Sequence, residues 1–192
     1  EKVYDGFVKA KLLRQSSGAR YMPISVSYVG TLDYKTSKFS DSLYNSVIGK
    51  RPWLRAFYTH QLLIARKFGE GTSVQLMPTV VHRNYVKTAA DKNDIYSIGI
   101  GARQKLNKRI AVNVEYFYTL PNQLSSSYRN TLSLGLDIET GGHVFQLFFT
   151  NSNGTDTRGV LTETTGKWAD GDIRFGFNVS RVFTVYNPKN RE

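Results

Sequence analysis

The chain contains no cysteine, few prolines and no long hydrophobic run. Its 192 residues include 5 prolines and 16 glycines, and the formal net charge is +11. The lack of cysteine excludes a disulfide framework, a thiolate metal site and a cysteine nucleophile. No run approaches the roughly eighteen consecutive apolar residues of a membrane helix, so a helical membrane protein is excluded. The mean hydropathy of −0.37 still allows a transmembrane β-barrel, because barrel strands alternate apolar and polar residues.

The length of the chain fits one domain. We therefore expect a single β-barrel domain over residues 1–192, with a polar C-terminal tail over residues 186–192. The chain starts at Glu1 without an initiator methionine or a signal-peptide pattern. It is therefore either a mature protein or one whose start is missing. The positive charge fits a solvated surface, nucleic acid, anionic lipid or an anionic solute.

Nine segments alternate apolar and polar residues with a period of two, which is the pattern of half-buried strands. They span residues 4–12, 24–33, 53–66, 73–83, 95–105, 109–119, 131–139, 143–151 and 172–185. The phase of the third segment is unclear. Strands of soluble domains are typically about five or six residues long, whereas a tilted membrane strand needs about nine to eleven. Segment length therefore favours a membrane barrel, although periodicity alone does not show which face meets lipid.

The links between the segments alternate in length. Short links follow the third, fifth and seventh segments (68–72, 106–108 and 140–142), and the first link, 13–23, is intermediate. Long polar links follow the second, fourth, sixth and eighth segments (34–52, 84–94, 120–130 and 152–171). This alternation is typical of barrels with short periplasmic turns and long outer loops.

Aromatic residues near the expected strand ends add a third indication of a membrane barrel, because such rings favour the membrane interface. Ordinary β-propensity explains a part of them. They are Tyr28, Tyr58, Tyr96, Tyr116, Phe117, Tyr118 and Phe183. The last segment also resembles the C-terminal targeting signal that the outer-membrane assembly machinery reads. The residues that carry this resemblance are Gly176, Phe177, Val179 and Phe183.

The number of segments indicates an incomplete barrel. If the last of nine antiparallel strands ends in the periplasm, the first strand must begin outside the cell. An odd number of strands is also atypical of bacterial single-chain barrels. An open edge facing lipid would leave unpaired backbone groups, each costing several kcal/mol. We therefore expect an odd number of N-terminal strands to be missing, most simply three, for a total of about twelve. The alternative is that another chain closes the barrel.

Charged residues on the polar faces of the segments are candidates for the lumen wall. They are Lys9, Lys11, Arg55, Arg103, Glu115, Asp137, Glu139, Asp172 and Arg174. Such charges must pair or meet water, since unpaired burial is very costly. One interpretation is a water-filled, weakly anion-preferring pore. The other is a ladder of salt bridges that closes a narrow barrel.

The remaining candidates for chemistry have ordinary interpretations. A metal site would need His60, His82 or His143 to converge with a carboxylate, and we interpret these histidines as hydrogen-bonded interfacial residues. The glycine-rich stretch 98–103 has no following helix and alternates as a strand, so it does not indicate a phosphate loop. We predict no catalytic, metal-binding or cofactor-binding residue.

Several stretches together carry a family resemblance. The most distinctive are Asp-Ile-Glu-Thr-Gly-Gly-His-Val-Phe-Gln at 137–146 and Phe-Thr-Asn-Ser at 149–152, and further ones lie at 4–9, 59–68, 75–84, 162–166 and 171–178. On these residues nearly the whole chain resembles a family of uncharacterised outer-membrane β-barrel proteins of Gram-negative bacteria. The resemblance implies an integral outer-membrane location and longer relatives with a signal peptide and more strands at the front. It implies no activity and no catalytic residues.

Three functions therefore compete. The first is a passive pore or small-solute channel. The second is a non-conducting structural subunit of a larger outer-membrane complex, and a hydrolase in the barrel wall ranks last, so we predict no enzyme. The expected partners are the lipid bilayer, lipopolysaccharide, the assembly machinery and other outer-membrane proteins. Nucleic acid is not expected, because the basic residues alternate through strands rather than forming a patch with stacking aromatics.

Overall fold

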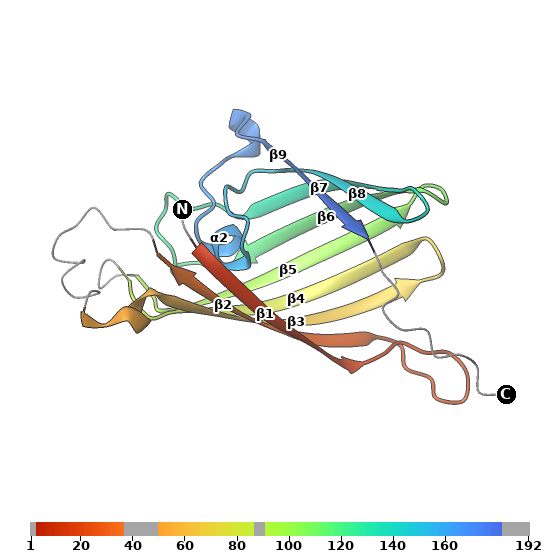
Figure 1. Cartoon of the computed structure of the whole chain (residues 1–192), viewed down its shortest axis with the longest axis horizontal. Helices are drawn as coiled ribbons and strands as arrows, with labels where there is room; N and C mark the ends of the chain where they lie inside the picture. The colour runs from red at the N-terminus through yellow and green to blue at the C-terminus, as the bar shows by residue number, and fades with distance from the viewer. Residues whose placement is uncertain (1–2, 37–49, 87–90, 182–192) are drawn as a thin grey trace.

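The computed structural model describes residues 3–36, 50–86 and 91–181. In this part of the chain, nine antiparallel strands form one sheet in which every strand pairs with its sequence neighbours (Figure 1). The strands are β1 (Val3–Leu13), β2 (Ser25–Lys35), β3 (Ala56–Phe68), β4 (Thr72–Arg83), β5 (Asp94–Lys105), β6 (Ile110–Thr119), β7 (Thr131–Glu139), β8 (His143–Thr150) and β9 (Arg174–Arg181). The predicted all-β, up-and-down architecture is therefore confirmed, and each predicted segment overlaps one strand.

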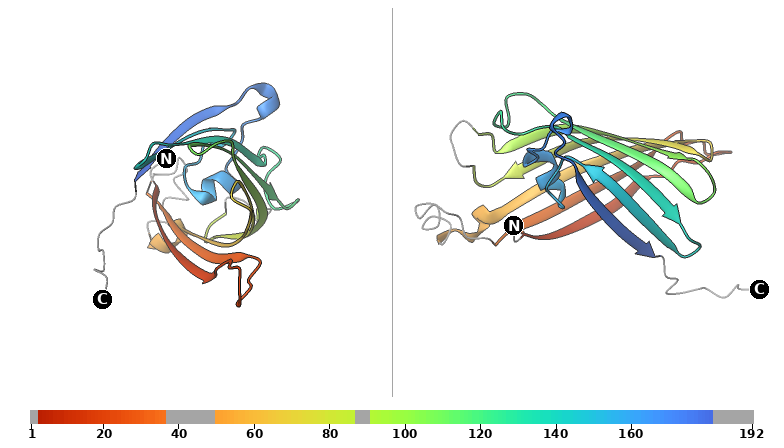
Figure 2. Two further views of the ribbon diagram at one scale, coloured as in Figure 1. Left: turned by 90° about the vertical axis from the view of Figure 1, so that its right-hand side faces the viewer. Right: turned by 90° about the horizontal axis from the view of Figure 1, so that it is seen from above.

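The sheet curls into a half-barrel that stays open between β1 and β9 (Figure 2). These two edge strands do not pair with each other in the described residues. The expectation of further strands at the N-terminus concerns sequence before Glu1 and stays a prediction. No helix in the described part of the chain is long and apolar enough to cross a membrane.

The apolar face of the sheet points outward. On β5, Ile98 and Ile100 are 46% and 51% exposed, whereas the intervening face carries Ser97 at 2%. A water-soluble barrel would turn its apolar face inward, and soluble proteins rarely expose a contiguous apolar wall. The same outward pattern runs around the half-barrel and includes Val8, Leu32, Leu76, Val114, Leu134, Phe149 and Phe177. This arrangement is that of a barrel whose outer wall meets lipid.

Two aromatic side chains on the inner face cover glycines of the neighbouring strands. Phe117 of β6 is paired with Gly99 of β5, and Phe148 of β8 is paired with Gly176 of β9. A Cβ at either glycine would overlap the facing ring. These positions therefore require glycine, and the ring packs where a side chain would otherwise stand.

The third strand begins later than predicted. Pro52 begins the 3-10 turn η1 (Pro52–Arg55), in agreement with the preference for proline at the first position of a helical turn. The prediction that Arg55 lies on a strand facing the lumen is therefore wrong. Arg55 ends η1, and its guanidinium donates to the Lys35 carbonyl at 3.1 Å.

The ninth strand also begins later, at Arg174. Gly171 takes a left-handed conformation with φ of 78°, and the Asp172 carboxylate accepts the Lys167 N–H at 3.2 Å. The prediction of Asp172 as a residue of the strand wall is therefore wrong, because its carboxylate closes a turn. Phe183 and the tail over 186–192 lie outside the described residues.

The outer wall carries the predicted tyrosines near the long-link ends of the strands. Tyr58, Tyr96, Tyr116 and Tyr118 are between 37% and 50% exposed. Phe117 is different, because it points inward and is only 7% exposed. Its assignment to the membrane interface is therefore wrong.

Candidate functional site

The link between β8 and β9 folds back into the half-barrel, and we call its residues 151–173 the plug. It contains the short helix α2 (Thr157–Thr162) and the 3-10 turn η2 (Trp168–Asp170). Figure 2 shows α2 inside the curve of the sheet. The Asp156 carboxylate caps the helix by accepting the Gly159 N–H at 2.9 Å. The link is slightly longer than predicted, and its helix α2 lies inside the barrel rather than outside it, whereas η2 projects beyond the sheet (Figures 1 and 2).

An apolar core joins the plug to the inner wall. Leu161 of α2 is 2% exposed and packs with Met77, Val81, Ile95 and Phe117. Three further side chains, Leu63, Leu124 and Val160, are partly buried against this core. Full burial of such a side chain stabilises by about 1.5–3 kcal/mol. The core therefore holds α2 firmly in the part of the lumen nearest the long links.

Threonine hydroxyls of the wall fix the backbone of α2. Thr131 donates to the Val160 carbonyl at 2.6 Å, and Thr119 donates to the Leu161 carbonyl at 3.2 Å. The hydroxyls of Thr131 and Thr164 are also hydrogen-bonded to each other at 2.9 Å. Because the last carbonyls of a helix have no partner within it, these wall hydroxyls satisfy groups that burial would otherwise leave unpaired.

Arg158 is the most deeply buried charge of the plug, with 1% of its surface exposed. Its guanidinium lies 2.5 Å from the Glu163 carboxylate, 3.4 Å from that of Asp156 and 4.7 Å from the centre of the Phe57 ring. Burial lowers the pKa of Arg158, but Glu163, Asp156 and the buried Asp33 of β2 outweigh burial and raise this pKa above its ordinary value. Arg158 is therefore permanently charged, and the acidic neighbours offset the cost of burying this charge.

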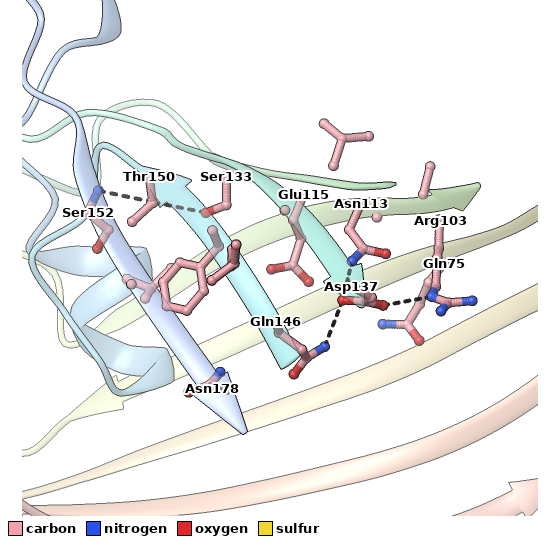
Figure 3. A pocket seen from close by; sticks show the side chains of 18 of the residues that line it. Gln75, Arg103, Asn113, Glu115, Ser133, Asp137, Gln146, Thr150, Ser152 and Asn178 are labelled. Carbon is pink, nitrogen blue, oxygen red and sulfur yellow. Dashed lines mark hydrogen bonds and ion pairs between the residues drawn. The ribbon is translucent and has the colours of Figure 1, made fainter. Parts of the chain in front are cut away.

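Behind the plug, residues of β3–β9 and of the plug itself line an open cavity of about 820 Å³, whose wall carries both polar and apolar side chains. Figure 3 shows the centre of its wall. The Asp137 carboxylate of β7 accepts from Arg103 Nε at 2.9 Å, from Asn113 Nδ2 at 2.7 Å and from Gln146 Nε2 at 3.1 Å. Four neighbouring strands thus meet at one carboxylate, which satisfies the charge and ties the wall together.

Glu115 points into the same cavity without a partner. In the part of the chain that the structure describes, no hydrogen bond or ion pair involves its carboxylate, which lies close to the Asp137 network (Figure 3). The charged side chains of the cavity wall are Arg103, Arg174, Glu115 and Asp137. Positive and negative charges are therefore balanced in the cavity, and Glu115 is the carboxylate left available to a solute.

The structure brings four of the nine predicted lumen residues to the cavity, namely Arg103, Glu115, Asp137 and Arg174. Lys9 and Lys11 pair with Val29 and Ser27, which places them on the inner face of β1, yet neither lines the cavity. Glu139 lies exposed at the short-turn end of β7.

The three histidines do not converge. His60 is hydrogen-bonded to the Tyr28 hydroxyl at 2.6 Å, and His82 lies 2.7 Å from the Asp94 carboxylate. His143 packs against Phe145 with the ring centres 6.4 Å apart. Across the described residues, no group of three or more His, Cys, Asp or Glu side chains is arranged to hold a metal ion.

The plug and its buried arginine are functional features that the sequence reasoning missed. The available signal was a capping residue, Asp156, followed by the apolar pair Val160 and Leu161. A helix of 6 residues gives too short a periodic pattern to stand out, since such helices depend on tertiary packing.

Comparison with known proteins identifies a family. A family described as "Membrane bound beta barrel domain (DUF5777)" matches residues 1–183. No curated protein and no solved structure matches the chain significantly. The match covers nearly the whole chain and agrees with the outward apolar wall. The chain therefore belongs to this family of membrane-bound β-barrel domains.

Proposed function

We propose that this membrane-bound β-barrel domain is an integral outer-membrane protein of Gram-negative bacteria that forms a plugged passage for small polar solutes. The observation that carries the proposal is the cluster of charged and amide side chains in the wall of the cavity of about 820 Å³ behind the plug. A structural core would not need these side chains, and one of them, Glu115, has no hydrogen-bond or ion-pair partner among the described residues. Such a wall suits transient contacts with a hydrated solute.

The balance of charge in the cavity favours small solutes that are neutral or weakly charged. Arg103 is neutralised by Asp137 at 2.9 Å, so it does not set a positive field alone. The remaining charges, Arg174 and Glu115, have opposite signs. The wall therefore gives no support to the predicted anion preference.

The plug is the gate in this proposal. Leu161 and its apolar neighbours fill the lumen toward the long links, so a solute passes only when α2 moves away from the wall. The hydrogen bonds from Thr119 and Thr131 to α2 must then open. We therefore expect the unmodified protein to be closed for most of the time and to open in brief events.

A second candidate is the non-conducting structural subunit of a larger outer-membrane complex. The observation in its favour is the density of the same apolar core around Leu161, which would serve a permanently closed barrel equally well. Under either proposal the partners are the lipid bilayer with lipopolysaccharide, the assembly machinery and other outer-membrane proteins. Neither proposal includes a catalytic residue.

Planar-bilayer recordings of the full-length protein separate the two functions. We expect rare openings of the unmodified protein and frequent openings of a Val160→Ala/Leu161→Ala variant, because the loss of the two side chains loosens α2 from the wall. Leu120→Ala, at an exposed position on the long-link side, is the control and should behave like the unmodified protein. If both the unmodified protein and the loosened variant are silent while their β-sheet circular dichroism is intact, the passage is wrong and the structural role is favoured.

A further inference from the structure

Among the described residues, a local excess of positive charge lies at the short-turn end of the half-barrel. Seven exposed basic residues lie in three successive hairpin ends, after β1, β3 and β5, and we call them the basic rim. They are Arg14, Arg20, Arg66, Lys67, Lys105, Lys108 and Arg109. In these same hairpin ends the only acidic residue is Glu70. The basic rim therefore has a strong excess of positive charge.

The opposite end of the strands is different. Its described residues carry nearly equal numbers of the two signs. The basic ones are Lys35, Lys50, Arg51, Arg55, Arg83, Lys92, Arg129, Arg158, Lys167 and Arg174, and the acidic ones are Asp5, Asp33, Asp91, Asp94, Asp156, Glu163, Asp170 and Asp172. The excess at the basic rim is thus a local feature and not the general composition of the surface.

Hydrogen bonds connect the three hairpin ends to one another. Gln15 of the first hairpin donates to the Lys67 carbonyl at 3.0 Å, and the Lys67 N–H donates back to the Gln15 side chain at 2.8 Å. The Lys105 N–H donates to the Gly71 carbonyl at 2.8 Å, which ties the second hairpin to the third. These hairpin ends lie side by side on the right of Figure 1. The basic side chains therefore project from a connected edge rather than from independent loops.

Exposed apolar side chains lie between these basic residues. They are Leu12, Leu13, Tyr21, Phe68 and Leu106, between 41% and 68% exposed. The Arg66 guanidinium lies 4.9 Å from the centre of the Phe68 ring, on the outward face of β3. A surface that mixes exposed apolar and basic side chains suits the boundary between the acyl chains and the headgroups of a membrane. Binding of a soluble acidic protein would not require the exposed apolar side chains among the basic residues.

We propose that the basic rim binds the headgroups of anionic phospholipids in the leaflet on the short-turn side of the membrane. The apolar side chains enter the acyl region, while Arg66, on the outward face of β3, extends along the wall to the phosphates. Lys67 and Lys105 lie on the inner face at the ends of their strands and add to the positive field of the rim. Arginine and lysine both pair with phosphate oxygens. The excess of positive charge selects lipids with a net negative headgroup over zwitterionic ones. This binding does not depend on whether the lumen conducts.

The absence of cysteine from the chain allows a direct test. A single Ser17→Cys substitution in the first hairpin end carries a fluorophore, and the full-length protein is reconstituted into vesicles of phosphatidylcholine with a fraction of phosphatidylglycerol. Quenching is compared between brominated phosphatidylglycerol and brominated phosphatidylcholine. We expect the anionic lipid to be preferred at this position by about threefold or more, and the preference to fall at high salt. A Ser126→Cys label at the long-link end is expected to show no preference.

A charge-neutralising variant tests the residues themselves. Arg14→Gln, Arg66→Gln and Lys108→Gln together should abolish the preference at the Ser17→Cys label. The matched control removes three basic residues from the opposite end, through Lys50→Gln, Arg51→Gln and Lys92→Gln, and should retain it. Equal quenching by the two lipids in the unmodified rim, or an equal loss in both triple variants, would overturn the proposal. So would tight retention of the detergent-solubilised protein on polyglutamate without any lipid preference, because that result indicates an acidic protein partner.

Discussion

The guanidinium of Arg158 lies 4.7 Å from the centre of the Phe57 ring, inside a barrel whose outer wall is apolar. Phe57 belongs to the wall and Arg158 to the plug, so this cation–π contact connects the two parts directly. The acidic partners of Arg158, Asp156 and Glu163, lie on the plug itself. Arg158 therefore stabilises the internal fold of the plug and its attachment to β3 with one side chain.

Replacing Arg158 with methionine should loosen the plug without unfolding the barrel. Methionine keeps much of the volume but leaves the Asp156 and Glu163 carboxylates without their partner. Because Glu163 is 35% exposed and can meet water, we expect a cost of about 1–2 kcal/mol, below the roughly 3 kcal/mol of a fully buried pair. We expect faster amide hydrogen exchange over residues 157–164 and unchanged exchange in β4–β7. The control is Lys167→Met, which removes an exposed pair with Asp170 and should change exchange little. Equal protection of residues 157–164 in the two variants would contradict the role of Arg158.

The two covered glycines provide a test of the wall. A Gly99→Ala substitution should destabilise the barrel by about 1–3 kcal/mol, because the new methyl group overlaps the Phe117 ring in a packed interior. Gly101→Ala is the matched control on the same strand, since its nearest neighbour, Met77 Cε, lies at an ordinary 3.5 Å. Urea unfolding in lipid vesicles measures both. Adding Phe117→Leu to Gly99→Ala should recover part of the loss, and failure to do so would refute overlap with the ring as the cause.

The strands could be predicted from the sequence because their two faces meet different surroundings, lipid outside and polar side chains or water inside. The alternation fails where the inside is not polar. On β3, Leu63 points inward toward the plug core, next to the outward Leu62 and Ile64, so the phase of this strand is hidden in an apolar run. The plug itself could not be predicted, because α2 is held by distant partners such as Thr131 and Ile95. The sequence of α2 and its immediate neighbours does not indicate such long-range contacts.

Glu115 should set the charge preference of the passage. Neutralising it through Glu115→Gln removes one negative charge from the cavity wall, which is worth about 0.5–1 kcal/mol, a factor of about two to five, for a small ion close by in water. We expect the cation-to-anion permeability ratio to fall by this factor in bilayer recordings of the loosened plug variant. Glu139→Gln, at an exposed position outside the cavity, is the control and should leave the ratio unchanged. A ratio that responds equally to the two substitutions would show that the cavity does not lie on the conducting path.

The ion pair between Arg103 and Asp137 allows a test of how the cavity wall is stabilised. This test does not depend on whether the barrel conducts. The carboxylate is 8% exposed and holds three side-chain donors, whereas the guanidinium is 38% exposed. Removing Asp137 should therefore cost more than removing Arg103, since Asp137→Ala also leaves Asn113 and Gln146 without an acceptor. A double-mutant cycle with Arg103→Met and Asp137→Ala, measured by urea unfolding, should give a coupling of about 1 kcal/mol, because the exposed guanidinium is partly screened by water. A coupling near zero with an equal cost for both single variants would mean that the carboxylate does not organise the wall. The asymmetry is expected because Asp137 joins four strands, and because its carboxylate keeps the amide donors of Asn113 and Gln146 when Arg103 is lost.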